Sequence, residues 1–296
     1  MNASMLGQAA CLVAALLWAV AVTLFRRPVA VHGARTINLA KCVLATVLLA
    51  ATAGAGSAWH DLVSAPATDL VLLALSGLLG LTLGDSALFA AVTRIGVHRT
   101  LLLLTTAPVF TALLALPMGE RLSMLQLGGG VLILVGVALV VVPGGRSGQV
   151  ATVAGSGLLL GLVAALGQGS GVVVAKAGMS VVPVLPATLL RLAAASTGLA
   201  VVAAVRGELA RVVAAVTDLT ALRRVVPATI LGTYLAMLMM MAGIAAAPAS
   251  IAAVLLATTP VFSLILEAAV DRRWPALSGV VGTIVAVVGV AILTGG

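Results

Sequence analysis

The sequence contains very little charge. Only 8% of its 296 residues are Asp, Glu, Lys or Arg, whereas 62% are hydrophobic and the mean hydropathy is +1.28. A water-soluble domain of this length needs a charged surface to stay dispersed. Here uncharged stretches of about 18 to 22 residues follow one another along the whole chain. The composition therefore excludes a soluble globular protein and predicts an integral membrane protein.

Cysteines and long polar segments are also scarce. The two cysteines, Cys11 and Cys42, fall inside apolar stretches, where a thiol behaves as a small hydrophobe. No polar segment exceeds about thirty residues, so the net charge of +8 belongs to no basic soluble domain. The sixteen basic residues lie mostly at the ends of apolar stretches, where they meet lipid headgroups. We therefore expect membrane lipids as partners and no nucleic acid.

The motifs of several enzyme classes are missing as well. The sequence has no His-Glu-x-x-His for zinc, no Gly-x-Ser-x-Gly for acyl transfer and no Walker loop for ATP. Gly84-Asp85 resembles part of the intramembrane aspartyl protease element, but residue 82 is Thr82 where that element has glycine. A catalytic dyad also needs a second carboxylate at membrane depth, and Glu267 and Asp271 lie near the end of a predicted span. We expect no enzyme activity, no metal and no cofactor.

What the sequence has instead is a series of about ten apolar spans. Spans this long and continuous must be helices, because a membrane barrel strand needs only about ten residues and alternates apolar with polar. The predicted fold is an all-α integral membrane protein. The spans are expected near residues 6–25, 36–56, 69–92, 98–117, 124–142, 152–175, 185–205, 226–245, 249–270 and 276–294.

The spans form two blocks of five that match each other across a polar break at residues 143–149. A shift of 152 lays Thr105-Thr-Ala-Pro-Val-Phe110 on Ala257-Thr-Thr-Pro-Val-Phe262, and a shift of 150 lays Lys41 on Arg191. The predicted domains are residues 1–145 and 150–296, each a five-helix repeat. An odd number of spans per repeat inverts the second relative to the first, which is a transporter architecture.

These residues identify a resemblance to the ten-helix EamA-type members of the drug/metabolite transporter superfamily. It covers nearly the whole chain and rests on the repeat and on the stretches Gly84–Phe89, Arg94–Gly96, Ala107–Leu114, Gly119–Leu122 and Gly136-Val137, with Thr259–Phe262 and Gly289-Val290 in the second half. The resemblance implies a secondary carrier that exports small metabolites, such as amino acids, across the bacterial cytoplasmic (inner) membrane. It does not identify the substrate.

Asp85 is the one carboxylate expected in the middle of a span. An ionised Asp at the bilayer centre costs about 2.5 to 3.5 kcal/mol, so it must face protein or water. Two interpretations stay open: a proton-coupling or substrate-contacting acid, or an acid paired with a cation or with the helix backbone, for which Ser86 and Arg99 are nearby candidates. The matching cations Lys41 and Arg191 lie several residues inside their spans, and we expect them to be structural, each holding helix carbonyls or an acid. Direct contact with the substrate is the alternative.

Further residues are candidates for the lining of a substrate cavity. Two prolines in mid-span remove backbone hydrogen bonds beside paired threonines. Trp18 and Gln168 occupy equivalent positions of the first and sixth spans, and an aromatic and a methionine lie in the eighth. Packing and kinking are the alternative interpretation for each. The cavity candidates are Trp18, Asp85, Thr105, Thr106, Pro108, Gln168, Tyr234, Met237, Thr258, Thr259 and Pro260.

The function predicted from the sequence is a secondary active transporter of a small-molecule substrate, working by alternating access, with or without proton coupling. A flippase for lipids or lipid-linked sugars, or a membrane scaffold, is the alternative. Glycine-rich faces favour close helix packing, and both a monomer and a homodimer stay open. Both termini lie on one side of the membrane, but the resemblance places that side in the cytoplasm and the arginine distribution places it outside. The three histidines lie at or near predicted loops and are interpreted as surface residues.

Overall fold

The computed structural model describes residues 3–54, 58–115, 123–141, 148–246, 255–271 and 277–295. These ranges are almost entirely helical and contain no strand. Six helices in them are long and apolar enough to cross a membrane, and three shorter apolar helices accompany them. The predicted all-α membrane fold is confirmed.

The first repeat begins with two helices joined at Gly33, whose φ of 90° lies in the left-handed region that glycine tolerates. The third span is a composite helix with a π-helical middle, and the fourth is broken in two. The elements are α1 (Ala3–His32), α2 (Ala34–Ala53), the short α3 (Ala58–Ser64), α4 (Ala67–Gly77), the π-helical η1 (Leu78–Gly84), α5 (Asp85–Ile95), α6 (Val97–Leu104), α7 (Ala107–Ala115) and α8 (Met124–Val141).

The second repeat follows the same plan, including a short extra helix before its third span. Its eighth-span helix again has a π-helical middle. The elements are α9 (Gly148–Gly178), α10 (Val184–Val205), the short α11 (Leu209–Thr217), α12 (Leu219–Ala228), the π-helical η3 (Thr229–Leu235), α13 (Ala236–Ala246), α15 (Thr259–Asp271) and α16 (Leu277–Gly295).

The two repeats interleave. Helix α1 of the first packs on α13, η3 and α15 of the second, and α9 of the second packs on α4, η1, α5 and α7 of the first. The first helix of each repeat therefore packs against several helices of the other repeat. The predicted division at residues 145 and 150 stays a prediction, and residues 142–147 lie outside the described ranges.

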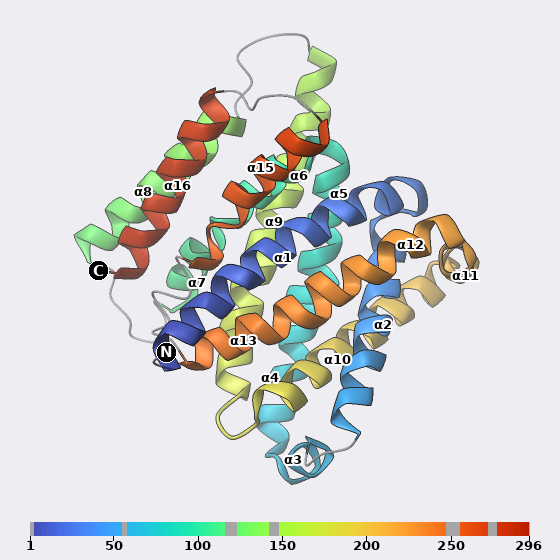
Figure 1. Ribbon diagram of the computed structural model, residues 1–296. Coiled ribbons are helices and arrows are strands. Elements are labelled where there is room, and N and C mark those ends of the chain that lie inside the picture. Colours follow the sequence, from blue (N-terminus) through green and yellow to red (C-terminus); the bar gives the residue numbers. More distant parts are fainter. Residues whose placement is uncertain are drawn as a thin grey trace.

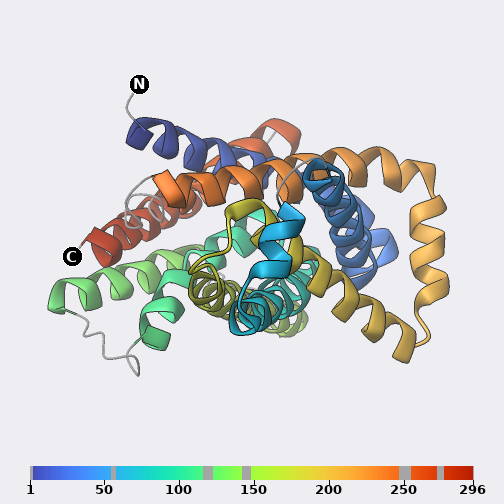
Figure 2. The ribbon, with the colours of Figure 1, turned by 90° about the horizontal axis from the view of Figure 1, so that it is seen from below.

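A pseudo-two-fold axis relates the repeats. The fifth helices of the two repeats, α8 and α16, lie side by side (Figures 1 and 2) and cross through glycines: Gly129 faces Gly289, and Gly136 faces Gly282. Residue numbers rise along one helix as they fall along the other, so these equivalent helices are antiparallel. A two-fold axis that reverses helix direction must run across the helices, in the membrane plane. The predicted inversion of the repeats is confirmed.

The same axis passes between α2 and α10. Thr46 and Ser196, which the repeat shift of 150 makes equivalent, lie with their hydroxyl oxygens 3.2 Å apart. A residue can contact its own equivalent only near the axis. The second and seventh helices therefore meet at the centre of the symmetry, one helical turn or so from Lys41 and Arg191.

Candidate functional site

Asp85 is the centre of a polar cluster that joins both repeats. The Lys41 ammonium from α2 forms an ion pair with Asp85 Oδ2, and Gln168 from α9 donates from Nε2 to Asp85 Oδ1 at 3.0 Å. Lys41 and Asp85 are 5% and 4% exposed. Removing such a pair from water is costly, and mutual attraction with added hydrogen bonds offsets that cost. We call Asn38, Lys41, Asp85 and Gln168 the Asp85 cluster.

Asn38 fixes the helix that carries Asp85. Its side-chain amide lies 2.8 Å from the carbonyl oxygen of Leu81 and 2.9 Å from Ser86 Oγ. Leu81 lies in η1, and a π-helical turn leaves carbonyls poorly satisfied and often marks a functional position. Asn38 and Lys41 are three residues apart on α2 and so share a face of that helix. Together they hold the end of η1 and the first residue of α5.

Lys41 has a second favourable contact, because its ammonium lies 5.1 Å from the centre of the Phe89 ring. Phe89 in turn packs on Phe25 of α1, with ring centres 5.1 Å apart. Cation–π attraction strengthens when water is excluded. The ring therefore gives the Lys41 charge a favourable contact in addition to Asp85.

Arg191, the equivalent of Lys41, has a different environment. It is 3% exposed, and its Nε and Nη1 atoms have no hydrogen-bond partner among the described residues. A Cβ at Gly77 would meet the Arg191 carbonyl oxygen at 2.1 Å, and one at Gly80 would lie 3.8 Å from Nη2. Glycines of α4 and η1 thus let α10 bring its guanidinium against the π-helical segment.

Helix α9 approaches η1 equally closely and also through glycines. A Cβ on Gly171 would lie 2.9 Å from the Gly80 Cα, and one on Gly167 would lie 2.8 Å from the Gly84 Cα. Backbone-to-backbone contact of this kind needs small residues and leaves no interlocking side chains. Gln168 lies within this contact and is thereby carried to Asp85.

The fourth and ninth spans break at equivalent points. Turns at Thr105-Thr106 and Ala257-Thr258 separate the helical segments, and Pro108 and Pro260 lie in the first turn of the helix that follows, where proline is tolerated. Each threonine hydroxyl donates to the carbonyl three residues earlier, at 2.6 to 2.7 Å. The threonines satisfy the carbonyls that the break frees, so the feature is a break and not a kink at the proline. Their cavity role stays a prediction.

The other predicted lining residues are spread over two packing clusters. Trp18 packs against a buried cluster that contains Phe25 and Phe89, whereas Tyr234 and Met237 pack against the buried residues between α2 and α10. The Tyr234 hydroxyl lies 2.7 Å from Thr52 Oγ1. The structure thus brings Asp85 and Gln168 into contact but shows no direct contact of either with Tyr234.

Two predicted environments are wrong. Asp85 pairs with Lys41 and Gln168, not with Ser86 or Arg99, because residues 44 positions apart meet when α2 packs against α5. His98 is 6% exposed and not a surface residue; its Nδ1 lies 3.3 Å from Ser263 Oγ where α6 packs on α15. Asn38 was not among the predicted site residues, although a polar amide inside an apolar span, one turn from Lys41, points to such a role.

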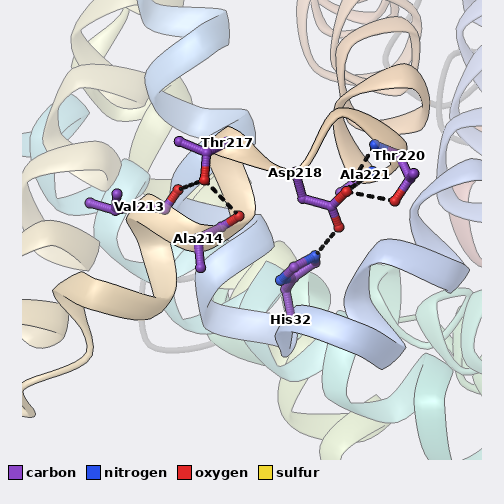
Figure 3. A network of polar contacts seen from close by, with 7 residues as sticks. All are labelled: His32, Val213, Ala214, Thr217, Asp218, Thr220 and Ala221. Carbon is purple, nitrogen blue, oxygen red and sulfur yellow. Dashed lines mark hydrogen bonds and ion pairs between the residues drawn. The ribbon is translucent and has the colours of Figure 1, made fainter.

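A second polar network links α1, α2, α11 and α12, and Figure 3 shows the part of it around Asp218. Asp218 caps α12 by accepting from the backbone of Thr220 and Ala221, and its Oδ2 lies 2.9 Å from His32 Nε2. Hydrogen bonds from the Thr220 hydroxyl and from His32 hold the pKa of Asp218 below its usual range. Arg35 donates to both carboxylate oxygens of Glu208, at 2.7 and 3.2 Å, and this lowers the pKa of Glu208. The network ties α11 and α12 to the turn between α1 and α2.

The chain matches a family of known function over both repeats. The EamA-like transporter family matches residues 5–142 and again residues 155–295. The chain belongs to the EamA-like transporter family. This EamA protein is therefore a membrane transporter of the drug/metabolite transporter superfamily, as the resemblance predicted. Comparison with proteins of curated function yields no significant match.

A solved structure agrees with the EamA fold. The crystal structure of another protein, 18% identical, superposes with a TM-score of 0.66 and covers 98% of this chain and 95% of its own. At this identity the likeness concerns the fold alone. Within the described ranges of the EamA protein, no group of three or more His, Cys, Asp or Glu could hold a metal ion.

Proposed function

We propose that this EamA protein is a secondary carrier that exports a small metabolite from the bacterial cytoplasm by alternating access, with Asp85 as its proton-coupling residue. The observation that carries the proposal is the Asp85 cluster, because it joins the two repeats at one titratable group. Lys41 and Asp85 belong to the first repeat and Gln168 to the second. Inverted repeats of this kind exchange conformations to move a site from one side of the membrane to the other.

The repeat symmetry supports a state-dependent contact at Asp85. The equivalents of Gln168 and Asp85 are Trp18 and Met237, which cannot form the same hydrogen bond. If the two repeats exchange conformations, the Gln168–Asp85 contact must open, since its counterpart cannot replace it. The contact therefore belongs to one state of the cycle.

A proton on Asp85 favours that opening. Protonation removes the charge that attracts Lys41 and replaces one acceptor oxygen by a hydroxyl. The inter-repeat contact weakens at the moment the proton binds. Proton binding from the outer side and release to the inner side would then drive metabolite outward.

Flux measurements in vesicles test this function. Purified protein would be reconstituted with a mixed metabolite pool, and efflux would be followed with and without a proton gradient. The natural sequence is expected to show gradient-driven flux, and Asp85→Asn is expected to lose the gradient dependence. Asp69→Asn is the matched control, because Asp69 is also a buried acid but accepts from Ser180 at a helix end, outside the Asp85 cluster.

Each outcome has a distinct meaning. Gradient-driven flux that survives in Asp85→Asn rejects Asp85 as the coupling residue but keeps the carrier. Flux of lipid-like solutes alone would instead indicate a flippase. Absence of flux for every solute would reject the transport proposal for the purified protein.

A further inference from the structure

Three buried ionisable groups lie on α2, α5 and α10, and their charges do not balance. Lys41 and Arg191 are cations, and Asp85 is the single acid. The Lys41–Asp85 ion pair uses that acid, and no carboxylate of the described residues lies within ion-pair distance of Arg191. One positive charge is left over at a depth where an unpaired charge is costly.

The leftover charge is concentrated on donors that have no acceptor. The Nε and Nη1 atoms of Arg191 are buried and without a hydrogen-bond partner among the described residues. The two N–H groups point to different edges of the guanidinium, and each edge presents a pair of donors that matches the two oxygens of a carboxylate. A buried donor that lacks an acceptor destabilises the protein. The pattern therefore fits a site that is completed by an anion.

The surroundings allow such an anion to reach the guanidinium. Arg191 lies against Gly80, and the backbone N–H of Asp85 donates to the Gly80 carbonyl, one π-helical turn away. Helix α9 approaches η1 through backbone at Gly167 and Gly171, on contacts separate from the approach of α10 at Gly77. The Gln168–Asp85 hydrogen bond, which must open in the proposed cycle, lies in this contact, so α9 and η1 separate when it opens. The separation would uncover the edge of η1 next to Arg191.

We propose that Arg191 binds the carboxylate of the transported solute, so that the substrates of this carrier are small monocarboxylates. The inference rests on the transport function proposed above. A single negative charge neutralises the group formed by Lys41, Asp85 and Arg191, whereas a phosphate dianion would leave an excess of negative charge. Arg191 is thus the substrate-binding cation, and Lys41 is the partner of the coupling acid, so the two equivalent cations have different tasks.

Equilibrium binding tests the site independently of transport. Purified full-length protein in detergent would be titrated at constant ionic strength with acetate and propionate, and in parallel with the neutral acetamide and propionamide. The shift in Tm gives the apparent Kd. Carboxylates are expected to stabilise the natural protein, and the amides are not. In Arg191→Gln the apparent Kd is expected to weaken by about 10- to 100-fold, the range for a charge-assisted pair of hydrogen bonds.

Three variants keep the result interpretable. Arg206→Gln removes an exposed arginine at the end of the same helix and is expected to bind like the natural protein. Arg191→Lys keeps the charge but loses the fork, so its affinity should lie between those of the natural protein and Arg191→Gln. Asp85→Asn leaves Arg191 in place and removes the one negative charge of the group, so carboxylate binding should be retained or strengthened. This variant tests the proposal even if Arg191→Gln does not fold.

Four results would overturn the proposal. They are equal carboxylate affinity in the natural protein and Arg191→Gln, equal stabilisation by carboxylates and amides, stabilisation by inorganic phosphate alone, and loss of carboxylate binding in Asp85→Asn. If carboxylates fail to bind while vesicle flux of another solute persists, the carboxylate site is rejected and the carrier stands. If carboxylates bind but nothing is transported, the site stands and the transport function is rejected.

Discussion

At the residue scale, the Lys41–Asp85 ion pair places two charges inside a membrane protein at less than a tenth exposure each. The pair is tolerated because its members compensate each other and because Gln168 and Phe89 add further contacts. Removing one member leaves an uncompensated buried charge, whereas removing both leaves an apolar contact. A functional pair and a purely structural pair share this energetic signature, so stability and flux need to be measured on the same variants.

Lys41→Met is expected to destabilise the protein by about 3 kcal/mol, because it leaves the buried Asp85 carboxylate without a cation to pair with. The double variant Lys41→Met/Asp85→Leu should recover most of that loss. Unfolding in detergent of the two single variants and the double variant gives the coupling free energy. A double variant no more stable than Lys41→Met would contradict a coupled pair. If Asp85 is the coupling residue, the double variant should fold well and still show no gradient-driven flux.

At the scale of elements, glycines decide how closely the helices approach, and they act at matching places in both repeats. Gly80 of η1 meets Gly171 of α9, and the equivalent Gly232 of η3 meets Ala21 of α1. The π-helical segments and the Thr-Pro breaks also recur at equivalent positions. Close backbone contact gives van der Waals attraction that lipid cannot supply. The spans that bear the candidate site are thus held by contacts between backbones.

Gly136→Ala is expected to destabilise the α8–α16 contact by about 1 to 3 kcal/mol, because its Cβ would lie 2.5 Å from the backbone nitrogen of Ala286 and the opposing helix must move. Gly128→Ala is the matched control on the same helix, since a Cβ there meets nothing within 4 Å. Alanine should leave or raise stability at that site. Equal unfolding free energies for the two variants would show that α8 and α16 do not pack as described.

At the scale of the whole molecule, the inverted symmetry divides the contacts between repeats into two kinds. Contacts between equivalent residues, such as Thr46 with Ser196, map onto themselves when the repeats exchange conformations. The Gly129–Gly289 and Gly136–Gly282 contacts map onto each other. The Asp85 cluster has no such counterpart. The pairs α2–α10 and α8–α16 are therefore expected to persist through the cycle, while the contacts of α9 with η1 change.

A disulfide between Thr46→Cys and Ser196→Cys, in a background with Cys11→Ala and Cys42→Ala, should consequently leave vesicle flux intact. The two hydroxyl oxygens are 3.2 Å apart, so the new thiols lie close enough to oxidise with small adjustments. Flux would be compared before and after oxidation, and again after reduction. Reversible loss of flux on oxidation would mean that α2 and α10 must separate, which the symmetry argument forbids.

The amino-acid sequence by itself determined that this protein lies in lipid, that it is helical and that it consists of two inverted repeats. Apolar spans without charge can be stable only in lipid, and in lipid only helices satisfy their own backbone. Matching prolines, glycines and cations in the two halves fix the repeat, and an odd number of spans fixes its inversion. Each of these conclusions depends on local composition and spacing, which a single sequence contains in full.

Only the tertiary structure decided which polar residues meet. Lys41 and Arg191 are equivalent in the sequence, yet one pairs with Asp85 and the other does not, because the second repeat has Met237 where the first has Asp85 and because α9 brings Gln168 to one side only. His98 likewise becomes buried when α6 packs on α15. Partners across 44 or more residues depend on how whole helices pack, and periodicity along the chain does not encode that packing.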